Sequence, residues 1–136
     1  MYWLSHHPPE ELDRTWRLGG LHVCARCLGV YPVLLLGLVI QFALGAPLQL
    51  RLDGMMGVVL TMPALFDWAY GRWRPHAGSN LWRTSTGVLL GVALARSLYV
   101  HLQRPFPPVL LAQLSLVGVV VVGVLLLGFF SPKARG

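Results

Sequence analysis

The chain has 136 residues, of which 55% are hydrophobic and 12% charged, and its formal net charge at pH 7 is +6. A soluble domain carries about 25% charged residues, and a small one has too little interior to bury so much leucine and valine. The composition therefore excludes an ordinary soluble domain and predicts one integral membrane domain over residues 1–136. The positive charge does not indicate nucleic-acid binding, because the arginines stand between apolar blocks with no recognition helix beside them.

A short polar N-terminal segment, residues 1–27, is followed by four apolar segments. They cover about residues 28–44, 55–70, 85–102 and 109–130. A helix that spans the bilayer needs about 20 largely apolar residues. We therefore predict an all-α bundle of four transmembrane helices. The second segment contains Pro63 and Asp67, so a kinked or re-entrant helix is the alternative there.

Small residues recur inside the predicted spans. Gly87 and Gly91 lie one turn apart in the third span, and Gly118 and Gly123 lie in the fourth. Glycines spaced by one turn let helix backbones approach closely in lipid, which favours tight packing at Gly87 and Gly91. The alternative is that glycine is simply commoner in membrane helices. Glycine-rich helix faces would also suit a homo-oligomer.

The distribution of basic residues predicts the orientation in the membrane. In a four-span chain the N-terminal segment, the loop between the second and third spans and the C-terminus share one side. Eight basic residues belong to that side: Arg14, Arg17, Arg26, Arg72, Arg74, Arg83, Lys133 and Arg135. Three belong to the other: Arg51, Arg96 and Arg104. Short basic flanks stay in the cytoplasm, so both termini are expected there. A three-span chain would instead place the C-terminus outside.

The two cysteines, Cys24 and Cys27, form a Cys-x-x-Cys pair at the start of the first span. Two thiolates at this spacing reach a single metal ion, and thiolates combined with imidazoles favour zinc, with iron less favoured. His6, His7 and His22 are the nearest candidates for the remaining ligands. The same pair is the dithiol of thiol oxidoreductases. A third interpretation is two small apolar groups at the helix start with no chemistry.

A polar cluster is expected on the same cytoplasmic side, formed by Arg26, Asp67, Asn80 and Arg83. Asp67 is the acidic residue nearest the interior of a span. A carboxylate inside the membrane is costly, faces the bundle and finds a partner. We expect that partner to be Arg26 or Arg83. A salt bridge that locks the spans together is favoured over a proton relay or an ion pathway.

The segment Cys24-Ala25-Arg26-Cys27-Leu28-Gly29-Val30-Tyr31 resembles the C-x-R-C-x-G-[IV]-Y segment of small bacterial and archaeal membrane proteins, catalogued as domain of unknown function two thousand and eighty-five. A Pro-x-x-x-Asp element at 63–67 and an Asn-x-x-Arg-x-x-x-Gly element at 80–87 follow in the family's order. The resemblance covers about residues 5–95. It implies a polytopic protein of a prokaryotic plasma membrane and implies no reaction. Where the family has a cysteine before a histidine this chain has Ser5, and His7 or His22 would have to replace the missing thiolate.

Together these patterns predict a non-enzymatic membrane protein, surrounded by the lipid bilayer, whose cytoplasmic face carries a metal-binding His/Cys cluster. One alternative is a membrane enzyme, either a thiol oxidoreductase or a metal-dependent hydrolase. Another is a small transporter or channel subunit, for which Asp67 and Arg96 are the support.

Overall fold

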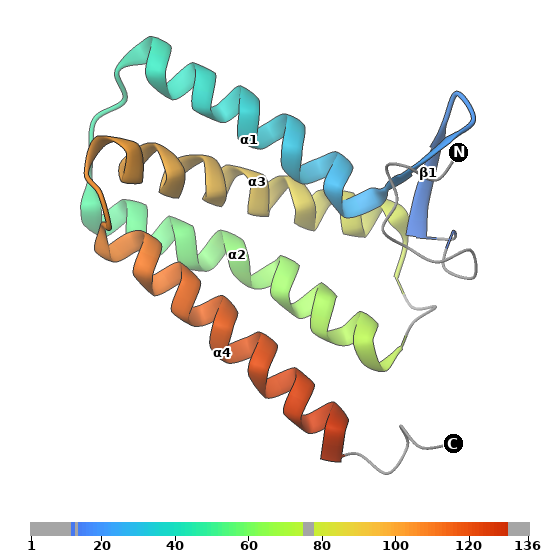
Figure 1. The fold of residues 1–136 in the computed structure, drawn as a ribbon. Coiled ribbons are helices and arrows are strands. Elements are labelled where there is room, and N and C mark those ends of the chain that lie inside the picture. The colour runs from blue at the N-terminus through green and yellow to red at the C-terminus, as the bar shows by residue number, and fades with distance from the viewer. Residues whose placement is uncertain (1–11, 13, 75–77, 131–136) are drawn as a thin grey trace.

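The computed structural model describes residues 12, 14–74 and 78–130. An antiparallel hairpin, β1 (Thr15–Leu18) with β2 (Leu21–Cys24), precedes the four helices of the bundle. The helices are α1 (Ala25–Leu44), α2 (Leu50–Trp73), α3 (Asn80–Gln103) and α4 (Pro108–Phe130) (Figure 1). Each predicted span lies inside one of these helices, and each helix is longer than the span at one or both ends. Three of them, α1, α3 and α4, are long and apolar enough to cross a membrane.

Helix α2 is long enough to span but has no stretch apolar enough to be counted with these three. Its 24 residues reach about 36 Å, against a hydrocarbon core of about 30 Å. It runs as one helix through Pro63. Its buried side is small and polar: Asp53, Gly57, Thr61, Ala64 and Asp67. Its exposed side carries large apolar residues such as Met55, Val59 and Phe66. This distribution is the reverse of a soluble helix and suits a helix surrounded by lipid.

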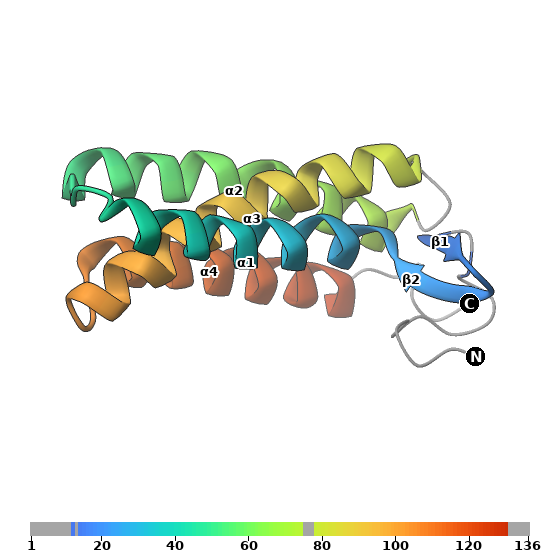
Figure 2. The ribbon, with the colours of Figure 1, turned by 90° about the horizontal axis from the view of Figure 1, so that it is seen from above.

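In Figure 1 the helices follow one another in the order α1, α3, α2, α4, and Figure 2 shows them from above with the hairpin at one end. Helix α1 packs mainly on α3, and α4 packs mainly on α2. The start of α1, the end of α2, the start of α3 and the end of α4 lie together beside the hairpin, and we call this the hairpin end. The opposite end holds the connections between α1 and α2 and between α3 and α4, and we call it the far end.

Glycines bring α1 and α3 into backbone contact. A Cβ atom on Gly87 would lie 2.5 Å from the carbonyl oxygen of Arg26, and one on Gly91 would lie 2.7 Å from that of Val30. The predicted packing role of Gly87 and Gly91 is confirmed. The glycine face of α3 is therefore used within the chain. In contrast, Gly118 and Gly123 of α4 have no heavy atom of a described neighbour within 4 Å of such a Cβ.

The hairpin is the part of the fold that the all-α prediction omitted. Thr15 pairs with Cys24 and Leu18 pairs with Leu21 across the two strands. Gly19 and Gly20 form the turn with φ angles of +54° and +84°. Two-residue turns of this kind need positive φ at both positions, which glycine adopts without strain. The hairpin leads directly into α1, so it fixes how the N-terminal segment meets the bundle.

Candidate functional site

At the hairpin end, an ion pair joins α1 to α2. Asp67 lies in the last two turns of α2 and its side chain is 6% exposed. Its Oδ2 accepts a hydrogen bond from Nη2 of Arg26, in the first turn of α1. Arg26 was one of the two partners expected for this carboxylate. A buried carboxylate close to a membrane is strongly disfavoured unless a cation compensates it, and Arg26 supplies that charge.

Arg83, near the start of α3, lies close to this pair. The Nη2 atom of Arg83 and the Oδ1 atom of Asp67 each lie 4.0 Å from the position a Cβ on Gly78 would take. Arg83 is itself buried. Asn80 points elsewhere, because its Nδ2 donates to the carbonyl of Thr15 in the hairpin at 3.1 Å. The structure thus gathers Arg26, Asp67 and Arg83 into one group, the hairpin-end cluster, and gives Asn80 a separate role.

The hairpin is fastened across the ends of three helices. Trp16 Nε1 donates to Thr84 Oγ1 at 3.0 Å, and Arg14 Nη2 donates to the carbonyl of Gly71 at 3.3 Å. Thr84 Oγ1 in turn lies 3.0 Å from the carbonyl of Ala25 and 2.8 Å from that of Asn80. These contacts tie the segment before α1 to the end of α2 and to the start of α3.

The two cysteines meet where the hairpin joins α1. Cys24 is the N-cap residue of α1 and is buried, and Cys27 follows it in the first turn. Both are free thiols, three residues apart at the start of α1. The backbone thus presents both sulfur atoms as a pair.

The histidine ligands expected beside this pair are only partly accounted for. His22 lies on β2, two residues before Cys24 and on the same side of the strand. Among the described residues, no three His, Cys, Asp or Glu side chains are close enough together to hold a metal ion. His22 therefore does not complete a three-ligand group with Cys24 and Cys27 here. His6 and His7 lie outside the described residues.

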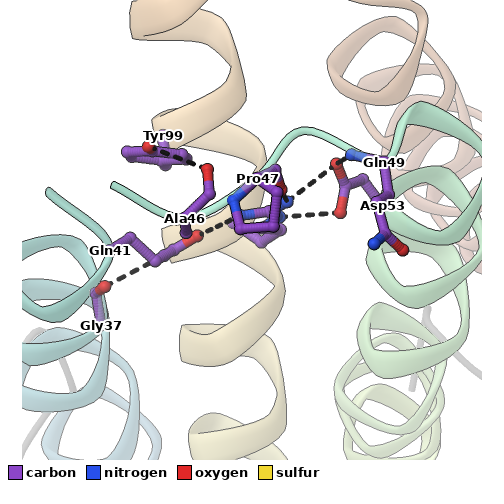
Figure 3. Close-up of polar contacts among 8 residues, drawn as sticks. Gly37, Gln41, Ala46, Pro47, Gln49, Asp53 and Tyr99 are labelled. Carbon is purple, nitrogen blue, oxygen red and sulfur yellow. Dashed lines mark hydrogen bonds and ion pairs between the residues drawn. The ribbon is translucent and has the colours of Figure 1, made fainter. Parts of the chain in front are cut away.

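A second polar cluster, at the far end, links three helices (Figure 3). Asp53 near the start of α2 is buried and accepts two hydrogen bonds from Arg96 of α3, from Nε at 2.7 Å and from Nη2 at 3.1 Å. Arg96 Nη1 donates to Gln41 Oε1 of α1 at 3.0 Å, and Nη2 donates to the carbonyl of Pro47 at 2.5 Å. We call Asp53, Arg96 and Gln41 the far-end cluster. Its guanidinium holds the α1–α2 connection against α3.

Two further contacts stabilise the far-end cluster. The backbone N–H of Gln49 donates to Asp53 Oδ2 at 3.0 Å (Figure 3). Tyr99 donates from its hydroxyl to the carbonyl of Ala46 at 3.1 Å, and its ring lies 5.5 Å from the guanidinium carbon of Arg96. The two hydrogen bonds from Arg96 to Asp53 form a bidentate pair, because the planar guanidinium matches both carboxylate oxygens. This is the strong form of an arginine–carboxylate pair.

Between the two clusters, α2 carries a buried polar contact with α4. Gln113 Nε2 donates to Thr61 Oγ1 at 2.8 Å, and Thr61 Oγ1 donates to the carbonyl of Gly57 at 2.6 Å. Both side chains are almost completely buried. Hydrogen bonds of this kind join helices in lipid, where the hydrophobic effect does not. The contact is the main polar link that α4 makes with the other helices in the described part of the chain.

Residues 10–97 match a family model described as "Predicted membrane protein (DUF2085)". The chain belongs to this family. The matched region includes the hairpin, α1 and α2, and it ends in the last third of α3, one residue past Arg96. Both interhelical ion pairs therefore lie inside the family region, while α4 lies outside it. No curated protein and no solved structure matches the chain significantly.

The far-end cluster is the part of the site that sequence reasoning missed. The sequence indicates Arg96 as a charge that sets topology and as support for a transporter, and it does not single out Asp53. The spacing of the two aspartates in the sequence was a signal for this cluster. Asp53 and Asp67 are 14 residues apart, which is close to four helical turns, so both fall on one face of a continuous helix. Two inward carboxylates on one membrane helix predict two cationic partners.

Proposed function

We propose that this family member is a non-enzymatic, metal-binding protein of a prokaryotic plasma membrane. Its hairpin end binds zinc, with iron the less favoured metal. Cys24 and Cys27 supply two thiolates, and His6 and His7 of the N-terminal segment supply the imidazoles. The observation that carries the proposal is the placement of two free thiols, Cys24 at the N-cap and Cys27 in the first turn of α1.

The surroundings of the thiols support a structural role for the metal. The hairpin that leads to Cys24 is already fastened to the ends of α2 and α3. A tetrahedral site adds two ligands to the two sulfurs. Ligands from residues 6 and 7 would tie the start of the chain to the first turn of α1. The metal would then close the hairpin end around the Arg26–Asp67 pair.

Metal analysis of purified protein tests the proposal directly. We expect about one zinc per chain, lost in Cys24→Ser and in the double variant His6→Ala/His7→Ala. The matched control is His101→Ala, because His101 lies in the last turn of α3 at the far end. Zinc that is absent from the wild type, or that survives Cys24→Ser, contradicts the metal site. Loss of zinc in His22→Ala but not in the double variant would assign the imidazole to β2 instead.

The charge pattern supports an orientation with both termini in the cytoplasm. Six arginines of the described residues belong to the hairpin end, namely Arg14, Arg17, Arg26, Arg72, Arg74 and Arg83. Reporter fusions at the C-terminus and at the α3–α4 connection test this orientation. Activity of a cytoplasmic reporter at the C-terminus, with activity of an exported reporter at the connection, is the expected result.

The described ion pairs favour a locked bundle over a transporter. Both buried carboxylates of α2 have an arginine partner on another helix. A carboxylate that carries protons or ions must instead be released from its partner during the cycle. Self-association, if it occurs, would use α4, since α1 covers Gly87 and Gly91 of α3. Analytical ultracentrifugation of Gly118→Leu against wild type tests that surface.

A further inference from the structure

Two buried polar atoms in the far half of the bundle have no hydrogen-bond partner among the described residues. They are the hydroxyl oxygen Oγ of Ser97, on α3, and the side-chain carbonyl oxygen Oε1 of Gln113, on α4. Ser97 is 1% exposed and Gln113 is 3% exposed. Buried polar groups in folded proteins are almost always hydrogen-bonded, either within the protein or to ordered water. These two atoms therefore indicate a partner that the described side chains do not supply.

The two residues lie at similar depths in the bundle. Ser97 lies six residues before the end of α3, and Gln113 lies five residues after the start of α4, so each is about 8–9 Å from the far end of its helix. Gly57 lies seven residues after the start of α2, which is about 10 Å from the same end. The orphaned atoms of α3 and α4 thus share one level with a glycine of α2.

Gly57 leaves room between α2, α3 and α4. A Cβ atom on Gly57 would lie 3.5 Å from Oγ of Ser97 and 3.6 Å from Cγ1 of Val109 on α4, which are ordinary contact distances. Gln113 is linked to the same glycine through Thr61. Its Nε2 donates to Thr61 Oγ1 at 2.8 Å, and Thr61 Oγ1 donates to the carbonyl of Gly57 at 2.6 Å. One further non-hydrogen atom therefore fits beside Gly57, next to one of the two orphaned groups and near the other.

The hydrogen-bond inventory selects the chemistry of the occupant. The hydroxyl of Thr61 donates to Gly57, so it accepts from Nε2 of Gln113 and leaves Oε1 as an acceptor. The hydroxyl of Ser97 offers a donor. An occupant that joins these two groups must accept one hydrogen bond and donate another, and water does both. A cation suits the site less well, because its charge would be uncompensated inside the bundle and Arg96 is the residue next to Ser97.

We propose that one water molecule binds beside Gly57 and joins Ser97 of α3 to Gln113 of α4. The water accepts a hydrogen bond from the Ser97 hydroxyl and donates one to Oε1 of Gln113. Helices α3 and α4 make little direct contact with each other, so the water adds a polar link between them. The site is separate from the thiols at the hairpin end and does not depend on the metal proposed there.

A crystal structure of the full chain, at a resolution that shows ordered water, tests the site directly. We expect a density peak within hydrogen-bond distance of both Ser97 Oγ and Gln113 Oε1. A peak that reaches only one of these atoms, or no peak, overturns the proposal. It is also overturned if Ser97 Oγ donates to the carbonyl of Ala93, one turn earlier, which is the common alternative for a serine inside a helix.

A methyl group in place of the water tests the site by stability. Gly57→Ala places a Cβ where the water would lie and leaves Ser97 and Gln113 without a partner. We expect the unfolding equilibrium constant in an SDS titration to rise by about tenfold, because buried polar groups are orphaned. The matched control is Gly54→Ala, one turn earlier on α2, whose Cβ would meet a carbon atom of Val109 at 3.8 Å. This control should be neutral or stabilising, since alanine is the better helix former.

A second background separates a displaced water from a steric clash. In Ser97→Ala/Gln113→Leu neither orphaned group remains, so adding Gly57→Ala should be neutral or stabilising there. An equal loss in both backgrounds would mean that the methyl group only clashes with its neighbours. A Gly57→Ala variant of the wild type that is as stable as Gly54→Ala would mean that no water is displaced. Either result overturns the proposal.

Discussion

Asp53 and Asp67 lie 14 residues apart on the same buried face of α2, and each is paired with an arginine of a different helix. Asp67 binds Arg26 of α1 at the hairpin end, and Asp53 binds Arg96 of α3 at the far end. Helix α2 is therefore held at both ends by charge, with small and polar residues between. Four predictions follow from this arrangement and from the packing around it.

Breaking the hairpin-end pair should destabilise the bundle more than removing it. Asp67→Asn leaves the guanidinium of Arg26 uncompensated. We expect a loss of up to about 3 kcal/mol, at the low end for a broken buried pair because Arg26 keeps a quarter of its side chain exposed. Unfolding of the purified protein by SDS in mixed micelles measures it. The double variant Arg26→Gln/Asp67→Asn should recover part of the loss. Arg17→Gln, an exposed hairpin residue, should change stability little. Equal stability of the single and double variants would argue against the pair.

The far-end cluster should distinguish arginine from lysine. Arg96→Lys keeps the charge but cannot make the bidentate pair with Asp53 and also reach Gln41 and Pro47. We expect a loss of about 1–3 kcal/mol from the unsatisfied groups. The matched control is Arg104→Lys, at an exposed position just after α3, which should be neutral. The same SDS titration compares the two. A neutral Arg96→Lys would mean that charge alone holds this end together.

The contact between α1 and α3 should tolerate no added methyl group. Gly87→Ala places a Cβ against the backbone oxygen of Arg26, so the two helices must separate. Overpacking of this kind costs about 1–3 kcal/mol. Gly118→Ala of α4 adds the same group where the described neighbours leave space, and its better helix propensity should make it neutral or slightly stabilising. Thermal unfolding in detergent ranks the two variants, and the reverse order would be inconsistent with the packing described above.

The polar contact between α2 and α4 should show coupling in a double-mutant cycle. Thr61→Val removes the acceptor for Gln113 and leaves a buried amide without its partner. We expect a cost of about 0.5–2 kcal/mol, the range found for hydrogen bonds between membrane helices and for orphaned polar groups. Thr61→Val/Gln113→Leu replaces both partners by apolar groups and should be less destabilised than the single variant. Additive effects in the cycle would mean that the two side chains do not interact.

The four helices were predictable because spanning requires a long apolar run, and length is a strong signal in a sequence. Arg26 was one of the two partners expected for Asp67, because a buried carboxylate in a membrane protein must find a cation. The hairpin was missed, although Gly19-Gly20 between two short alternating runs is a hairpin signal. The many polar and charged residues at positions 1–27 obscured this hairpin pattern.

The partner of Arg96 could not be read from the sequence in the same way. Arg96 lies at the level where a snorkelling side chain reaches water, and its contact with Asp53 exists only because α3 packs between α1 and α2. The placement of that helix depends on glycine contacts that involve residues far apart in the chain. Periodicity and composition describe single helices and give no order for them in space.

The two ion pairs also bear on how the chain enters the membrane during synthesis. The partner of Asp67 is made before α2, whereas the partner of Asp53 is made after it. When α2 is inserted, Arg26, the partner of Asp67, has already been synthesised, whereas Arg96, the partner of Asp53, has not. The charge of Asp53 can be neutralised only after α3 has been synthesised. We therefore expect α2 and α3 to insert into the bilayer together and to pack against α1, which is already in place.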